Sequence, residues 1–391
     1  MAKKRIALVT PSVLKWARKY RNFSEEEVAK RLKRSKKEII AWEGGKDSPS
    51  LAQARRISEI YKVPLAVFYL QSPPKKFSIL KDYRKVPTDY PRKDTPQLSF
   101  LISELENKQA WLKEYFSFEQ KKKLNFIGSA KQEDPIRSVV KSMRKNLSIS
   151  VSNQIKISKK SDFLRFLIRK IEEAGISVSR QGRVGRTRIE CIEIRGLAIC
   201  DQLAPFIFIN SNDAKSGQIF TLIHELAHLW INKSGISNIS YIDRKNFNSI
   251  EIYCNKVAAE FLMDSDYFWD MYNHEKNKLP LLKLIEKISD KFKVSPEAVS
   301  LKLKNKGKIS SGQYEKLRKR YKQIWEEYNK NKKKNSGFPS PNRTIAMKNS
   351  YLFTQIVITA YHQGTVSGRD ASALLSAKVN NFEKMFIYSF S

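Results

Sequence analysis

The sequence has 391 residues, 41% of them hydrophobic and 11% aromatic, which excludes a disordered chain and gives enough length for about two or three folded domains. Lys and Arg number 74 against 39 Asp and Glu, a formal charge of +35, so polyanions such as nucleic acid are the leading class of partner. A basic surface without a dedicated ligand is the alternative that charge alone leaves open.

Residues 1–74 have the pattern of short helices separated by polar turns. Ser24 followed by Glu27 is a capping box that predicts the start of one helix, and Ser35 predicts the start of a second. Side chains at the start of a helix in the major groove reach base edges and phosphates. We therefore expect double-stranded DNA to be contacted by Ser35, Lys36, Lys37, Ala41 and Lys46.

The segment 42–51 (WEGGKDSPSL) is a helix end with glycine, a turn and a Pro-Ser start to the next helix. Together with LKWAR at 14–18 and YKVPLAVF at 61–68, it resembles the Xre/Cro-type helix-turn-helix regulators over most of residues 9–74. A small helical docking module is the alternative interpretation.

The remaining chain alternates linkers, helices and one region with strand character. Residues 75–93 and 329–342 are Lys-rich and indicate linkers. Apolar periodicity predicts helices over 99–123, 134–147, 217–232, 246–263, 279–292, 295–304, 352–362 and 370–375. Runs of β-branched and aromatic residues predict strands over 176–178, 189–194 and 206–209.

These elements predict a mostly α fold with a small β-sheet, of the α+β class. An all-α N-terminal domain precedes a domain built around the sheet. The expected divisions are 1–74, 75–150 (linker and helical segment), 151–270, 271–328 (helical module), 329–342 (basic linker) and 343–391 (small helical tail).

His224-Glu225-Leu226-Ala227-His228 matches the H-E-x-x-H pattern. Residues i and i+4 share a helix face, so both imidazoles can hold one Zn²⁺ while the intervening glutamate acts as general base on the bound water. The alternative is two hydrogen-bonded histidines on a core helix. The sequence has 4 histidines in all, and two of them lie in this window, which favours a metal site.

A catalytic zinc keeps three protein ligands, so a third must come from elsewhere in the chain. Glu251 is our choice, because it lies on the next long helix, where small alanines permit close packing. Cys254 as a thiolate is a weaker candidate, since a lone buried cysteine usually packs as a small apolar residue. Glu260 and Asp243 are weaker still.

Four segments carry a second resemblance: 195–198 (RGLA), 204–210 (APFIFIN), 220–229 (FTLIHELAHL) and 251–263 (EIYCNKVAAEFLM). They are similar to the ImmA/IrrE family of metallo-endopeptidases, best over 194–263. The resemblance implies a gluzincin-like fold and zinc held by His224, His228 and Glu251. It also implies Glu225 as general base and a substrate that is often a regulatory DNA-binding protein. Asp264 departs from the family, in which many members have proline.

The strand that ends at Phe208, Ile209 and Asn210 precedes the metal helix. As an exposed edge it could align an extended peptide by backbone pairing. We therefore expect Phe208 and Asn210 to contribute to substrate binding.

Three cysteines without C-x-x-C spacing indicate neither a disulfide framework nor a zinc ribbon. Residues 1–13 lack the apolar segment of an export signal, and the sequence has no apolar run of about 18 residues. We therefore expect a cytoplasmic protein without a membrane partner. Its oligomeric state stays open, with a dimer as one possibility.

Three functions fit these features. The first is a zinc endopeptidase whose DNA-binding module places it near a promoter or a DNA-bound substrate. The second is a sequence-specific regulator or antitoxin, in a stress or phage response, in which zinc is structural or sensory. The third is a general nucleic-acid binder that uses only its charge.

Overall fold

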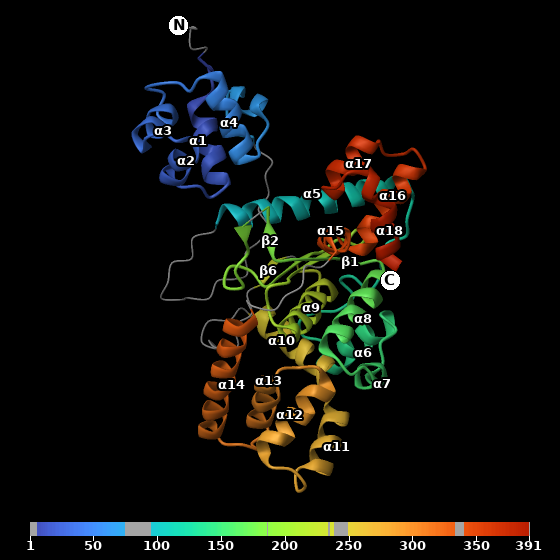
Figure 1. The fold of residues 1–391 in the computed structure, drawn as a ribbon. Coiled ribbons are helices and arrows are strands. Elements are labelled where there is room, and N and C mark those ends of the chain that lie inside the picture. The colour runs from blue at the N-terminus through green and yellow to red at the C-terminus, as the bar shows by residue number, and fades with distance from the viewer. Residues whose placement is uncertain are drawn as a thin grey trace. The chain divides into compact units, whose positions relative to one another are not determined.

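The computed structural model describes residues 6–74, 95–185, 187–233, 235–237, 249–332 and 340–390. It divides the chain into two compact units (Figure 1). The first comprises Met1–Leu80, Thr88–Glu104 and Val184–Ile189, and the second comprises Lys81–Pro87, Leu105–Arg183 and Glu190–Ser391. The predicted linker at 75–93 lies outside the described residues.

Short helices build the first unit. They are α1 (Pro11–Tyr20), α2 (Glu25–Leu32), α3 (Lys36–Glu43), α4 (Leu51–Tyr61), the 3-10 helix η1 (Leu65–Tyr69) and the beginning of α5 (Pro96–Phe118). Ser24, Ser35 and Ser50 each start a helix with a complete capping box, in which side chain and backbone satisfy each other's free groups. The predicted helix starts at Ser24 and Ser35 are confirmed.

A buried arginine joins three helices of this unit. Arg18 donates to Oε1 of Glu43 at 2.6 Å and to the carbonyl of Phe23 at 2.8 Å, and it also contacts Glu25. Pairing of this kind offsets the cost of burying a charge. The apolar core around it includes Val13, Ala17, Val28, Ile39, Trp42, Ala54, Ile57 and Phe68.

The second unit is built around a four-stranded mixed sheet with the order β1-β5-β4-β6. Its strands are β1 (Ser177–Gln181), β4 (Gly196–Ile199), β5 (Phe206–Asn210) and β6 (Gly235–Ser237). β1 runs parallel to β5, whereas β4 runs antiparallel to both β5 and β6. β2 (Arg183–Val184) and β3 (Thr187–Arg188) form a separate two-stranded sheet, of which all but Arg183 belongs to the first unit. Helix α9 (Lys215–Trp230) packs against β4 and β5.

The strand predicted over 189–194 is wrong. The backbone turns there, with the amides of Glu193 and Ile194 both bonded to the carbonyl of Glu190, and the strand begins later, at Gly196. Ile189 and Ile194 are buried while Ile192 is 66% exposed. Buried apolar residues on both sides of this turn therefore gave the segment the composition of a strand.

Helices surround the sheet and continue away from it. They are α6 (Ile136–Asn146), α7 (Val151–Lys156), α8 (Lys160–Glu173), α10 (Ser249–Leu262), α11 (Ser265–Glu275), α12 (Leu281–Phe292), α13 (Pro296–Asn305) and α14 (Ser311–Lys332). The end of α14 includes residues 329–332 of the predicted basic linker, and 333–339 lie outside the described residues.

The C-terminal residues form further helices that pack on this unit. They are α15 (Pro341–Asn349), α16 (Tyr351–His362), α17 (Gly368–Leu375), the 3-10 helix η2 (Val379–Asn381) and α18 (Phe382–Phe390). Ser179 of β1 donates to the carbonyl of Lys348 at 2.6 Å, and the buried Lys108 of α5 donates to Oδ1 of Asn349 at 2.7 Å. Polar contacts thus tie the C-terminal helices to β1 and to α5.

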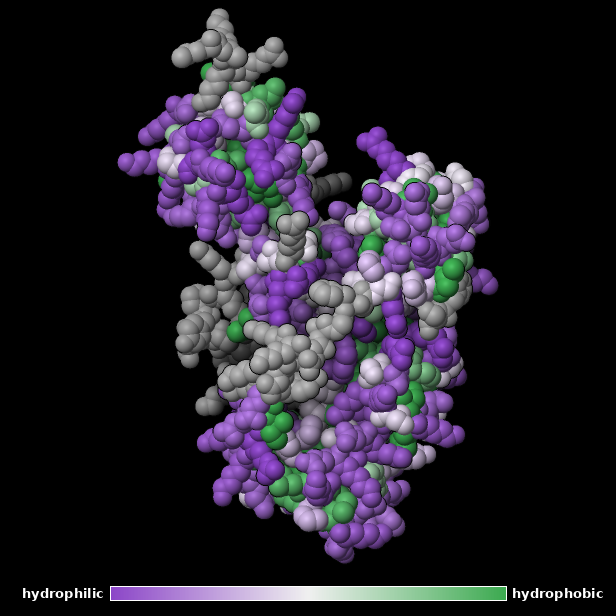
Figure 2. Space-filling view, in the orientation of Figure 1, coloured by the Kyte–Doolittle hydropathy of each residue, from purple (hydrophilic) through white to green (hydrophobic). Residues whose placement is uncertain are grey.

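Hydrophilic residues dominate the face of the molecule drawn in Figure 2, and the exposed apolar residues on it are scattered. Among the described helices, none combines the length and apolarity needed to cross a membrane.

Candidate metal centre and helix-turn-helix surface

Helix α9 presents His224, Glu225 and His228 inside the protein. Its apolar residues pack on all sides, with Ile219, Leu222, Ile223 and Leu226 at 0% exposure. A helix buried all round is typical of a domain core. His224 and Glu225 are also at 0% and His228 is at 1%, so the polar residues of the motif lie where burial requires a partner.

Helix α10 supplies that partner. Glu251, in its first turn, places Oε2 at 3.1 Å from Nε2 of His224 and Oε1 at 3.2 Å from Nε2 of His228. The two Nε2 atoms are 3.0 Å apart. α10 can approach α9 closely because Ala258 and Cys254 are small and fully buried. These three residues form the one group of potential metal ligands found among the described residues.

Burial and charge set the protonation of this group. Burial lowers the pKa of His224, and the nearby carboxylate of Glu251 opposes this only in part. Burial also disfavours the ionised form of Glu251, but hydrogen bonds and charge from His224 and His228 outweigh it and hold the pKa of Glu251 below its usual range. A neutral imidazole and an ionised carboxylate are the protonation states that bind a metal ion.

The rival third ligands do not join the cluster. Cys254 is buried, and burial together with the charges of Glu251 and Glu225 raises the pKa of its thiol well above the usual value, which disfavours a thiolate. Glu260 instead accepts from the hydroxyl of Ser265 at 2.6 Å. Asp243 lies outside the described residues.

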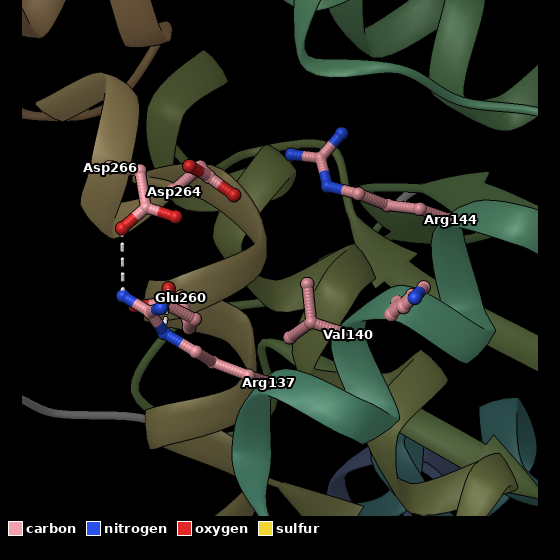
Figure 3. Close-up of a pocket in the computed structure, with 7 residues that line it drawn as sticks. Arg137, Val140, Arg144, Glu260, Asp264 and Asp266 are labelled. Atoms are coloured by element: carbon pink, nitrogen blue, oxygen red, sulfur yellow. Dashed lines mark hydrogen bonds and ion pairs between the residues drawn. The ribbon is translucent and has the colours of Figure 1, made fainter.

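Glu260 faces a different hollow, shown in Figure 3. This pocket has a volume of about 260 Å³ and is lined by Arg137, Val140, Lys141, Arg144, Glu260, Asp264 and Asp266. Arg137 crosses it to pair with Asp266 at 3.0 Å. Its lining has three basic and three acidic side chains, so the formal charges of the pocket balance.

The predicted exposed edge at Phe208–Asn210 is wrong. β5 lies between β1 and β4 and pairs with both, so its backbone is not available to an incoming peptide. Phe208 is at 0% and Asn210 at 1% exposure. The Asn210 side chain donates to the carbonyl of Ile194 at 3.0 Å and accepts from the amide of Asn212 at 3.0 Å, which are structural contacts.

Two site features were missed by the sequence interpretation. Gly196 of β4 lies directly against Glu225. The side chain of Asn255, like that of Glu251, opposes the lowering of the His224 pKa by burial. Asn255 has a sequence signal, because it follows Glu251 by four residues on the same helix face. Gly196 has none, because its neighbour is known only once strand and helix are packed.

The predicted DNA-contacting residues cluster around α3. Ser35 caps the helix, Lys36 and Lys37 are exposed in its first turn, Ala41 is half-buried and Lys46 is exposed beyond its end. The structure adds a contact between Lys36 and Glu26 of α2. The positive charge of Lys36 is therefore partly offset by Glu26, which makes Lys37 the stronger candidate of the two lysines for a phosphate contact.

Comparison with protein families gives two matches. Residues 178–304 match a peptidase family described as the IrrE N-terminal-like domain, and residues 14–68 match a family described as helix-turn-helix. The first range contains His224, Glu225, His228 and Glu251, and the second contains α2 and α3. No curated protein matches the sequence. The chain therefore combines a helix-turn-helix region with an IrrE-like peptidase domain, in the order that its sequence resemblances imply and with the expected mostly helical fold and small sheet.

Proposed function

We propose that this protein is a zinc-dependent endopeptidase that its helix-turn-helix module directs to DNA. The observation that carries the proposal is the meeting of His224, His228 and Glu251 within 3.2 Å of one another, with Glu225 next to the first histidine. Two imidazole nitrogens and one carboxylate form a ligand set of catalytic zinc sites. The burial of all three, and their inward-facing donor atoms, fit such an ion.

A zinc ion bound there would act as a Lewis acid that polarises a carbonyl and lowers the pKa of water to about 7. His224 and His228 would hold it as neutral imidazoles, and the negative charge of Glu251 would offset part of its charge. Glu225 would take a proton from the attacking water at a carboxylate oxygen as the water oxygen bonds to the scissile carbonyl carbon. It would pass that proton to the leaving amine as the C–N bond breaks.

The matched families support a peptidase that also binds DNA, and the substrate we propose is a regulatory protein. A repressor bound near the same promoter would be presented to the peptidase at high local concentration. Lys36, Lys37 and Lys46, with Ser35 and Ala41, would contact the DNA. Such a protein would work in the compartment that holds the DNA.

Glu225→Gln tests the peptidase function, because the amide keeps the size of the side chain and cannot accept the proton. Wild type and variant are expressed in the native cell, and new protein N-termini are compared across the proteome. We expect cleavage products with wild type alone and equal zinc content in both proteins. A variant that still cuts would remove Glu225 from the role of general base.

A transcriptional regulator with a structural or sensory metal is the second candidate. The helix-turn-helix match favours it, because that region by itself fits a DNA-binding protein. In this case substitution of Lys37 abolishes promoter binding and changes transcription, whereas Glu225→Gln has no effect on either.

A further inference from the structure

Gly196 of β4 lies directly against helix α9. A Cβ atom at this position would lie 2.2 Å from Oε1 of Glu225 and 2.5 Å from Cγ2 of Thr221, both far inside van der Waals contact. Thr221 and Glu225 are one helical turn apart, so the same face of α9 meets the glycine. The missing side chain leaves the space that the Glu225 carboxylate fills.

The backbone does not require glycine here. Gly196 is an ordinary member of β4, paired with Ile209 of β5 on one side and with Ser237 of β6 on the other. Its φ is outside the left-handed region that favours glycine. Alanine could adopt this conformation, so the contact with α9 is the constraint.

The two neighbours would yield to an added methyl group very differently. Thr221 is β-branched and 2% exposed, so its side chain has little freedom to rotate. The carboxylate of Glu225 ends a longer side chain with more rotatable bonds. The clash with Glu225 is therefore relieved by displacing this carboxylate, whereas the 2.5 Å clash with Cγ2 of Thr221 needs the shorter side chain of Thr221→Ala.

We propose that Gly196 is a positioning residue for Glu225: the bare backbone of β4 is the surface against which the general base is held. The inference rests on the proposed function, because it assigns the placement of the base to the sheet. It extends the site from two helices to a strand.

Gly196→Ala, made in a Thr221→Ala background that removes the second clash, tests the inference through kcat for a peptide that spans a cleavage site found in the proteome comparison. A displacement of about 1 Å at a reacting group can cost about a hundredfold in rate, so we expect kcat to fall by about that factor, with KM and zinc content nearly unchanged. Gly182→Ala is the matched control, since its Cβ would lie 2.7 Å from the side chain of Asn212, which is neither a candidate metal ligand nor the proposed base. It should retain activity, and full activity of Gly196→Ala would overturn the proposal.

A double-mutant cycle separates positioning from general damage to the fold. In a Glu225→Gln background the base is already lost, so Gly196→Ala should lower the residual rate little further. An equal loss in both backgrounds would show that Gly196 does not act through Glu225. If wild type and Glu225→Gln are equally inactive with zinc bound, the proposed function fails instead.

The contact itself has a readout that needs no activity. In metal-free protein that already carries Thr221→Ala, Gly196→Ala should lower the Tm, because the added methyl group then clashes with the Glu225 side chain. The loss should be smaller when Glu225→Ala also empties the space beside the strand. Equal Tm losses with and without the Glu225 side chain would overturn the proposed contact even if cleavage is never observed.

Discussion

The hydroxyl of Ser350 donates a 2.6 Å hydrogen bond to Oε1 of Glu172, which lies 178 residues earlier in the chain. The amide of Val178 donates to the same oxygen at 3.3 Å. Glu172 lies in the last turn of α8 and Ser350 caps α16, so this carboxyl links the end of one helix to the start of another. Burial raises the pKa of Glu172 to about 7, although these hydrogen bonds oppose the shift.

The raised pKa predicts a pH-dependent stability. The folded protein favours the protonated Glu172, so the stability it contributes is fully present below its ordinary pKa of 4.5 and is lost as the pH rises through about 7. The difference between these values corresponds to about 3 kcal/mol. In urea unfolding, the free energy of unfolding of Glu172→Gln relative to that of wild type should therefore rise by up to this amount between about pH 4.5 and pH 8.

Glu173→Gln is the control for this measurement, because its side chain is the neighbouring one in sequence and is exposed. It should follow wild type across the pH range. A constant difference between Glu172→Gln and wild type would refute the assignment of this pH dependence to Glu172.

Metal removal should destabilise the protein. A ligand that binds only the folded state adds stability by mass action, about 4 kcal/mol at a thousand times its Kd. We expect about one zinc per chain by elemental analysis, a lower Tm after chelation, and recovery of the Tm when zinc is restored. Protein that contains no metal and has a Tm unaffected by chelator or zinc would argue against the site.

The third ligand can be tested with two glutamates of the same helix. Glu251→Gln should reduce zinc affinity by more than the roughly 10–100-fold typical of a lost outer-shell partner, because it removes a charge at the ion itself. Glu260→Gln should keep wild-type affinity, since Glu260 contacts Ser265 and Arg137 instead. Zinc titration with a competing chelator measures both, and similar affinities for the two variants would contradict the ligand assignment.

DNA binding should depend on Lys37 more than on charge in general. Lys37→Ala should weaken binding to a selected operator and reduce the log–log salt slope by about 1, as expected for one lost phosphate contact. Lys283→Ala, on α12, changes the net charge equally and should leave affinity within about twofold. Equal effects of the two substitutions would favour binding by overall charge.

The cluster of His224, His228 and Glu251 could be predicted from the sequence because its determinants are local. The spacing of His224 and His228 needs only the helical repeat, and Glu251 is found from the next helix and its small neighbours. Capping boxes at Ser24 and Ser35 likewise depend on four consecutive residues.

Features that depend on long-range pairing could not be predicted in the same way. The apolar run at 206–209 has the composition of a strand, but nothing in it shows that β1 would pair beside it from almost thirty residues earlier. The edge assigned to Phe208 and Asn210 was wrong for that reason. Gly196 likewise gains its meaning only from the side chains of α9 that it meets.

The contacts of Lys348, Asn349 and Ser350 bear on how the protein can be shortened. A chain ending near residue 332 would remove the partners of Ser179, Lys108 and Glu172 together. Strand β1 would then lose the helices packed on it, and newly uncovered strands invite association between molecules. Attempts to isolate the peptidase domain should therefore retain the C-terminal helices.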